Sequence, residues 1–276
     1  MKTTKFKAGN KKAVCIEFNN MAQFLDYINT KQASDLFKQK EELNMLESLR
    51  DDEKAYRFTG TRNYNEAVEL MQNGWLEVAQ ELNKRLKKTV SASTLKNKRT
   101  FERRVSVQGA TPIVPLYLQG VPSNMQTTNI VQKKNKVITV NVNIGYNGGA
   151  SVEKIKTNAF CAIETIRNLE ASGYKCNLNI FDTAYEGSFG YVLKIKVKNA
   201  GERLNVSKLS FPLCHPSMLR RFTFRFAEVW EGLKFKYPEY GWCMNESMYE
   251  NAFSGEYILP QNSSFNETNI DACYIK

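Results

Sequence analysis

The sequence predicts an α/β fold in which helices flank a central sheet, and three observations in residues 136–198 lead to this class. Val137–Ile144 alternates apolar and polar residues, which is typical of a strand. A long helical pattern follows it, with apolar residues at spacings of three and four. Two more strands are then expected at Cys176–Phe181 and Tyr191–Val197. Only a short connection separates the long helix from the strand at Cys176–Phe181. The two strands that the helix joins are therefore expected to lie side by side and parallel.

The connection between the first strand and the long helix contains Gly145, Gly148 and Gly149, which tolerate a tight crossing turn. Ser151 is placed to cap the helix, and Gly173 is placed to end it. The apolar stripe of this helix consists of Val152, Ile155, Ala159, Ile163, Ile166 and Leu169.

Residues 1–88 are expected to form a mostly helical N-terminal region, with a short strand at Ala13–Phe18. Asn63 precedes Glu66 by the spacing of a capping box, and Gly74 is expected to stop that helix. The other helices expected here follow Asn20 and cover Ser34–Asp52 and Trp75–Lys88.

Three further segments complete the predicted organisation. Residues 89–108 form a basic linker, 109–236 form the α/β domain, and 237–276 form an irregular tail that packs on it. Three prolines make Gly109–Met125 an extended, turn-rich segment. Leu204–Leu213 is expected to be a strand or a helix-to-strand step, and a helix is expected from Pro216 or Ser217 to Trp230.

Bulk composition predicts a folded cytoplasmic protein. Of the 276 residues, 42% are hydrophobic, enough for a packed core, and no segment approaches the roughly 20 apolar residues of a membrane span. The start of the chain is basic and lacks the apolar stretch of a secretory signal. The six scattered cysteines are therefore expected to be reduced.

A net charge of +11 permits an anionic partner. Nine basic residues and one acid lie between Lys84 and Arg104, and this run is either a solvated tether or helix extension, or a contact for nucleic acid. Only Phe101 offers an aromatic ring within its linker part, which is little for base stacking. The candidate phosphate contacts are Lys96, Lys98, Arg99, Arg103, Arg104, Arg220, Arg221 and Arg225.

In this order of elements, Val137–Trp230 resembles a divergent von Willebrand factor A-like domain. The resemblance rests on the apolar strand, the loop, the long helix and the Gly173–Cys176 entry to the next strand. Two stretches, GATPIVPLYLQGVPSNM and FPLCHPSMLRRFTFR, also resemble a group of uncharacterised phage-encoded proteins. The resemblance implies a Rossmann-like sheet, and a partner such as an AAA-type ATPase or a phage assembly component.

Domains of this type commonly hold a metal through an Asp-x-Ser-x-Ser loop. The corresponding residues here run from Asn143 to Asn147 and offer neutral amides and a glycine, so the adhesion site is degenerate and no metal is expected. Asp182 and Thr183, with Glu186 nearby, are the remaining oxygen donors, in a loop after the second strand. The candidate partner-binding loop therefore comprises Asn143, Gly145, Tyr146, Asn147, Asp182 and Thr183.

Catalytic patterns are sparse, and neither an enzyme nor a cofactor is expected. His215 adjoins Cys214, which suggests either a thiol nucleophile or a histidine that hydrogen-bonds a neighbour. Asp182 and Glu186 are either an acid/base pair or solvated carboxylates. The glycines after the first strand lack a nucleotide-binding spacing, and their loop is either a ligand contact or only a crossing turn.

Two functions are thus predicted, with a hydrolase third. The first is a non-enzymatic phage protein that docks a protein partner through its strand-end loops. The second is a nucleic-acid-associated phage protein that binds phosphates through the basic linker. Either would act inside the infected bacterial cell, without a membrane partner.

Overall fold

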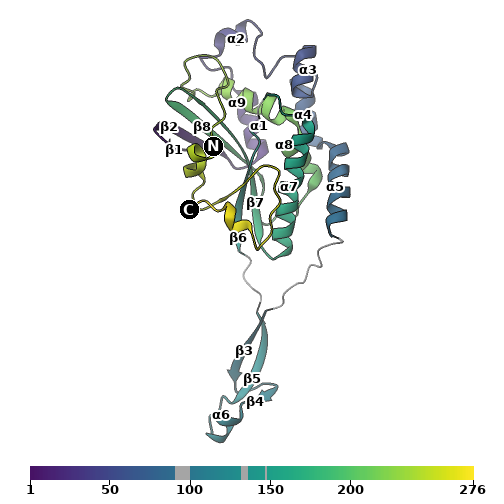
Figure 1. Cartoon of the computed structure of the whole chain (residues 1–276), viewed down its shortest axis with the longest axis vertical. Helices are drawn as coiled ribbons and strands as arrows, with labels where there is room; N and C mark the ends of the chain where they lie inside the picture. Colours follow the sequence, from purple (N-terminus) through teal and green to yellow (C-terminus); the bar gives the residue numbers. More distant parts are fainter. Residues whose placement is uncertain (91–99, 132–135, 147) are drawn as a thin grey trace. The chain divides into compact units, whose positions relative to one another are not determined.

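The computed structural model describes residues 1–90, 100–131, 136–146 and 148–276. The chain divides into two compact units, one made of 1–93 with 137–276 and the other of 94–136. The first unit contains a six-stranded sheet with helices, and the second contains a three-stranded sheet and one short helix (Figure 1). An α/β class is therefore correct for the first unit.

The six strands of the large sheet lie in the order β1-β2-β8-β7-β6-β9. The predicted parallel pair is confirmed, because β6 and β7 run parallel in a register that joins Val137 to Lys175 and Asn143 to Phe181. β7 and β8 form an antiparallel hairpin, so the sheet is mixed. The strands are β1 (Lys2–Ala8), β2 (Lys11–Phe18), β6 (Val137–Asn143), β7 (Lys175–Glu186), β8 (Phe189–Lys198) and β9 (Tyr257–Leu259).

Both ends of the chain contribute strands to this sheet, which the predicted boundaries did not include. β2 pairs in parallel with β8, and β1 pairs with β2 to form the sheet edge. At the opposite edge, β9 from the expected irregular tail pairs in parallel with β6. Residues 1–88 are therefore not a separate helical region, and 237–276 supply part of the sheet.

Helices of the first unit begin where the sequence places capping side chains. Asn20 Oδ1 accepts from Gln23 N, Asn63 Oδ1 accepts from Glu66 N, and Ser151 Oγ accepts from Lys154 N. Among the described residues, no helix has the length and apolar content that crossing a bilayer requires. The α-helices are α1 (Met21–Thr30), α2 (Lys38–Glu42), α3 (Glu53–Thr59), α4 (Tyr64–Asn73), α5 (Leu76–Val90), α7 (Val152–Ala171), α8 (Val206–Cys214), α9 (Phe224–Val229) and α10 (Glu246–Tyr249).

Two predicted elements differ from the structure, one in length and one in type. The helix expected over 34–52 is wrong in length: α2 ends at Glu42, and Asn44 turns the chain with a left-handed φ of 55°. The strand alternative for 204–213 is wrong, because Val206–Cys214 is the buried helix α8. The helix expected up to Trp230 is confirmed as a π-helical turn η1 (Met218–Thr223) followed by α9. Two 3₁₀ helices, η2 (Glu250–Phe253) and η3 (Ile270–Cys273), complete the first unit.

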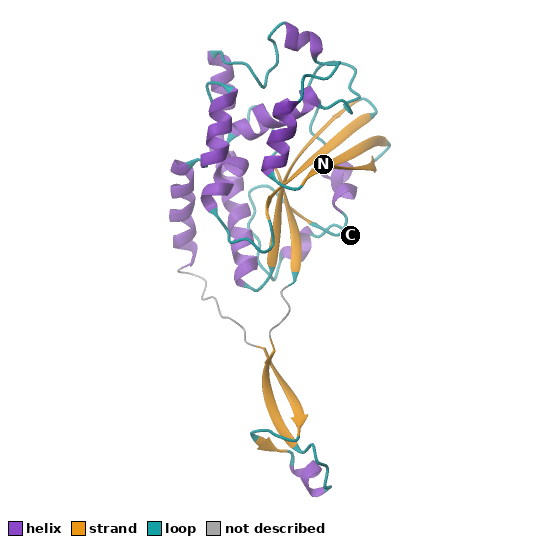
Figure 2. Ribbon diagram, turned by 180° about the vertical axis from the view of Figure 1, so that it is seen from behind, coloured by secondary structure: helices purple, strands orange, loops and turns teal. Residues whose placement is uncertain are grey.

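Helices cover one face of the sheet, where α1, α7 and α8 enclose the main apolar core (Figure 2). The other face is covered by the C-terminal segments, with Phe181 packed against Tyr249 and Phe253.

A row of buried polar side chains also lies on this second face of the sheet. Lys194 Nζ pairs with Glu17 and with Glu256, whose carboxylate accepts from Asn141 Nδ2. These ion pairs compensate the charge of Lys194, whose side chain would otherwise be costly to bury at 6% exposure.

The second unit consists of β3 (Thr100–Ser106), β4 (Thr111–Pro112), α6 (Val114–Leu118) and β5 (Met125–Val131), and the term ribbon refers below to these elements. β5 lies between β3 and β4, antiparallel to both. The expected linker 89–108 thus includes a strand. Residues 109–125, expected at the start of the α/β domain, lie instead in this separate unit.

Gly74 gives a test of the packing between α4 and α8. Its backbone has φ 78° and ψ 157°, and a Cβ there would lie 2.4 Å from the carbonyl oxygen of Ser207. We expect Gly74→Ala to lower the free energy of unfolding by about 2 kcal/mol in urea denaturation, because strain and overlap combine. Gly173→Ala is the control: φ is 94° but no atom lies within 4 Å, so about 1 kcal/mol is expected. Equal losses would contradict the close contact.

Candidate functional site

The predicted loop residues at the end of β6 do come together. Asn143 Oδ1 accepts a hydrogen bond from Gly145 N at 2.7 Å. A Cβ at Gly145 would lie 2.9 Å from Asp182 Oδ1 and 3.0 Å from Asn143 Oδ1, so only glycine lets the two oxygens approach this backbone. Asn147 lies outside the described residues.

This cluster is closed, however, and the expectation of an accessible loop is wrong. Asp182 and Thr183 belong to strand β7 and are 6% and 2% exposed. Thr183 Oγ1 accepts from Met244 N at 3.1 Å, so the segment before α10 helps to cover them. Tyr146 is also buried, and its hydroxyl accepts from Asn158 Nδ2 at 2.6 Å. These side chains position one another and do not form a docking surface.

Asp182 has the unusual electrostatics of a buried carboxyl. Burial raises its pKa from 3.8 to about 6, although hydrogen bonds involving the Thr223 side chain and the Thr183 backbone oppose the rise. Glu186 stands four residues further along the same strand, about 13 Å away at the usual rise per residue. The two carboxyls therefore do not form an acid/base pair. Among the described residues, no group of three or more His, Cys, Asp and Glu side chains is arranged to hold a metal.

His215 is buried between aromatic rings. Its Nδ1 accepts from Ser217 N, and its ring stacks on Phe211 and makes a T-shaped contact with Trp75. Burial, with Arg221 nearby, lowers the pKa of His215 to about 4, and burial raises the pKa of the Cys214 thiol to about 12. The hydrogen-bonded histidine, not the thiol nucleophile, fits this geometry.

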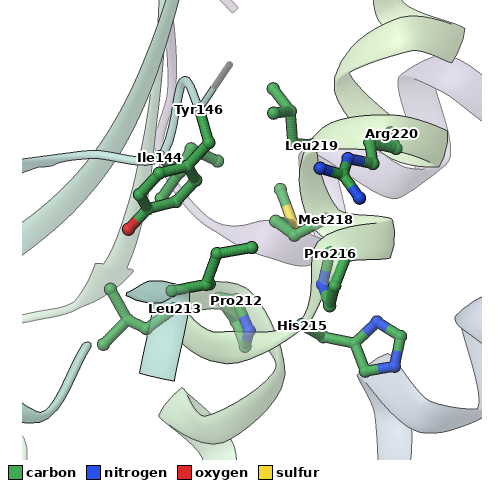
Figure 3. Close-up of a pocket in the computed structure, with 10 residues that line it drawn as sticks. Ile144, Tyr146, Pro212, Leu213, His215, Pro216, Met218, Leu219 and Arg220 are labelled. Atoms are coloured by element: carbon green, nitrogen blue, oxygen red, sulfur yellow. The ribbon is translucent and has the colours of Figure 1, made fainter. Parts of the chain in front are cut away.

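A small cavity separates His215 from the strand-end cluster. It is lined mainly by apolar groups such as Ile144 and Met218, and its free volume is about 10 Å³, which is about one water molecule. Figure 3 shows the imidazole pointing away from Tyr146, with Met218 and Pro212 between them. This cavity has no room for a small-molecule substrate.

Arg220, Arg221 and Arg225 are structural, and their prediction as phosphate contacts is wrong. They are 6%, 0% and 8% exposed. Arg221 donates to the carbonyls of Ser48, Arg50 and Thr61 at 2.7–2.9 Å and to Thr61 Oγ1 at 2.6 Å.

The other two arginines are also engaged. Arg220 donates to the carbonyls of Phe58 and Gly148, and Arg225 donates to Lys31 O and forms an ion pair with Glu228 at 3.6 Å. All three guanidinium groups thereby tie the helix of η1 and α9 to the chain before α4.

Two of the remaining candidate residues, Arg103 and Arg104, lie on the ribbon. Arg103 and Arg104 are exposed, and because they are successive residues of β3 they point to opposite faces. Lys96, Lys98 and Arg99 lie outside the described residues. Residues 94–136 contain eight Lys or Arg and one Glu, a net charge of +7 within the chain's +11.

The ribbon also lacks a core in its described part. No side chain of residues 103–127 is buried. Its tip is nevertheless well formed: Val121 N donates to Leu116 O and Gly120 N donates to Tyr117 O, with Gly120 at φ 70°. This turn presents Val114, Tyr117 and Leu118 to solvent at 59%, 65% and 78% exposure. The sequence analysis did not predict this apolar tip. The run of apolar residues between Pro112 and Pro122 could have indicated it.

Comparison with known protein families places this chain in a family. A family model described as a domain of unknown function, DUF7192, matches residues 3–274 and so extends over both units. No curated protein and no solved structure matches the chain.

Proposed function

Because this chain belongs to the DUF7192 family, whose description states no function, we propose its role from its own structure. It is a non-enzymatic binding protein that contacts a protein partner through the ribbon. The observation that carries this proposal is the ribbon tip, where three large apolar side chains are more than half exposed in a unit without a buried side chain over 103–127.

Such a surface is unfavourable unless something covers it. A three-stranded sheet needs an apolar face packed against another element for stability, and contiguous exposed apolar groups on a folded protein mark contact sites. Covering Val114, Tyr117 and Leu118 removes apolar area from water, which favours association. The backbone hydrogen bonds of the tip already fix its shape, so little ordering is required on binding.

A binding role also agrees with the first unit. Its strand-end cluster is closed, its single histidine is buried with a low pKa, and its neighbouring cavity holds about one water molecule. The buried arginines and the polar row on the sheet have partners within the fold. These groups support a scaffold role for the first unit.

The resemblance of 137–230 to von Willebrand A-like domains, and of two stretches to phage-encoded proteins, belongs to the same proposal. It favours a protein partner of the assembly type, such as an AAA-type ATPase or a phage assembly component, inside the infected bacterial cell. In this proposal the contact has moved from the strand-end loops to the ribbon.

Nucleic acid is the second candidate partner, because the net charge of +7 is concentrated in residues 94–136. Arg103 and Arg104 are exposed on opposite faces of a narrow ribbon, an arrangement suited to a groove with phosphates on both walls.

Photo-crosslinking separates the two candidates. A photoreactive amino acid at Tyr117 in the full chain, irradiated in the producing cells, is expected to yield protein adducts because the tip lies in the contact. Mass spectrometry and nuclease sensitivity identify the adducts. The control position is Tyr237, which is 52% exposed in the first unit and is expected to give few. Nucleic-acid adducts at position 117, or no adducts beyond those at 237, would contradict the proposal.

A further inference from the structure

Strand β1 forms one edge of the large sheet (Figure 1). Its backbone groups alternate in direction, because β1 and β2 are antiparallel. Lys12 N donates to Ser188 O, away from β1, so Lys12 and its register partner Lys7 do not bond to each other. The N–H and C=O groups of Lys7, and by alternation those of Lys5 and Thr3, therefore point outward from the sheet.

This β1 edge, formed by the outward backbone groups of Thr3, Lys5 and Lys7, is largely open. Lys7 O accepts from Asn251 Nδ2 at 3.2 Å, which agrees with the outward direction and closes one end of the edge. Within the described part of the chain, no hydrogen bond engages the outward groups of Thr3 and Lys5. Donors and acceptors that alternate at strand spacing are complementary to another extended backbone, which binds such an edge as an added strand.

The side chains along the β1 edge favour an acidic strand. Residues 1–12 contain five lysines and no acid. Lys5, Lys7 and Lys12 are exposed and share one face of the sheet, because Lys5 and Lys7 alternate along β1 and Lys12 lies opposite Lys7. Acidic residues at alternate positions of an added strand would have their Cβ atoms about 5 Å from those of Lys5 and Lys7, close enough for ion pairs.

The residue between these two lysines faces the other side of the sheet. Phe6 is partly buried there against the apolar cluster that contains Ala8 and Ala13. An apolar residue between two acids of the added strand would lie beside Phe6 and extend this cluster. A second copy of β1 does not fit, because it would bring lysines against lysines, which is how edge strands avoid pairing with themselves.

We propose that the β1 edge binds an extended segment of a protein partner as a seventh strand of the sheet, and that this segment alternates acidic with apolar residues. This contact goes beyond the proposed function, because it lies on the first unit and does not use the ribbon.

Fluorescence anisotropy with a labelled peptide tests the added strand. The probe alternates Glu and Val over seven residues, the length of β1, and is mixed with the full chain. The wild type is expected to bind it, and more weakly as salt rises. Lys5→Pro is expected to bind at least about tenfold more weakly, because the proline ring removes an outward N–H and blocks the edge without removing a hydrogen bond to β2.

Three further variants separate backbone from charge. Lys5→Gln keeps the outward N–H and is expected to bind about threefold more weakly, through the loss of one cross-strand ion pair. Lys87→Gln removes an exposed charge from α5, and Tyr117→Ser alters the ribbon tip. Both of these controls are expected to bind like the wild type. Wild-type affinity in Lys5→Pro would contradict strand addition.

Hydrogen exchange on the wild type tests the same contact without a substitution. The peptide is expected to slow exchange at the amides of Thr3 and Lys5 and to change little at Phe6, whose amide already faces β2. A peptide of the same charge with proline as its central residue is expected to give no protection, because it cannot pair as a strand.

Four results would overturn the proposal. The first is no binding of the alternating peptide, and the second is equal binding of the proline-containing peptide, which would show attraction by charge alone. The third is equal protection of the two amides by single-stranded DNA. The fourth is their protection at high protein concentration without peptide, which would show that the chain pairs with itself.

Discussion

Replacing Arg221 by leucine is expected to lower the free energy of unfolding by about 4 kcal/mol. The guanidinium is fully buried, and its loss removes its hydrogen bonds to the carbonyls of Ser48 and Arg50. The carbonyl of Thr61 also loses this donor but keeps a hydrogen bond from Thr59 Oγ1. Each buried polar group left unpaired costs about 1–3 kcal/mol, and leucine restores only part of the packing. Urea unfolding followed by circular dichroism measures the change.

Two further variants make this result specific. Arg57→Leu alters an arginine whose side chain is 77% exposed and forms a surface ion pair with Glu53, so a change within about 0.5 kcal/mol is expected. Arg221→Lys retains the charge but cannot reach all three carbonyls with a planar fork, and its stability is expected to fall between the two. If Arg221→Leu costs no more than Arg57→Leu, the guanidinium does not hold α9 and η1 to the preceding chain.

The second large effect has the opposite sign. Asp182→Asn is expected to stabilise the protein at pH 7 by up to about 3 kcal/mol, because the wild type keeps a buried carboxylate ionised there. A rise in pKa from 3.8 to about 6 on folding corresponds to this energy at about 1.4 kcal/mol per pKa unit. Asparagine keeps an oxygen for the Thr183 backbone and carries no charge.

The pH dependence identifies the cause. Between pH 3.8 and about 6 the folded wild type binds more protons than the unfolded chain, so its stability falls as the pH rises, and above about 6 the penalty is constant. The advantage of Asp182→Asn should therefore be absent near pH 4 and complete near pH 7. Unfolding at both pH values measures it, with the exposed Asp26→Asn as the control, for which less than about 0.5 kcal/mol is expected. An advantage that does not change with pH would rule out ionisation as its source.

Local signals in the sequence predicted the elements whose formation is local. Asn20, Asn63 and Ser151 each satisfy a backbone donor three residues away, so their role can be inferred from spacing alone. The alternation in 137–144 and the stripe of the following helix likewise report on one strand and one helix. The parallel pairing of β6 with β7 could be predicted because only a short connection separates the helix from β7.

The environment of the site was not predictable in the same way. Arginine is ordinarily exposed, and Arg221 is buried because carbonyls more than 150 residues earlier in the chain surround it. Asp182 was expected in a solvated loop, but the segment around Met244 covers the strand that contains it. The ribbon was not predicted from the sequence. Its three prolines indicate an extended chain, but they do not show that β3 pairs with β5.

The pairing of β2 with β8 constrains the order in which the protein assembles. Ala13 lies beside Gly190, so the neighbour of an early strand is synthesised only after most of the chain has emerged from the ribosome. β6 acquires its second neighbour later still, when Tyr257–Leu259 is made. Contacts so distant in sequence form slowly, and the incomplete sheet exposes strand edges meanwhile. The edges of β2 and β6 that face these late strands therefore stay unpaired on the nascent chain until translation is nearly finished.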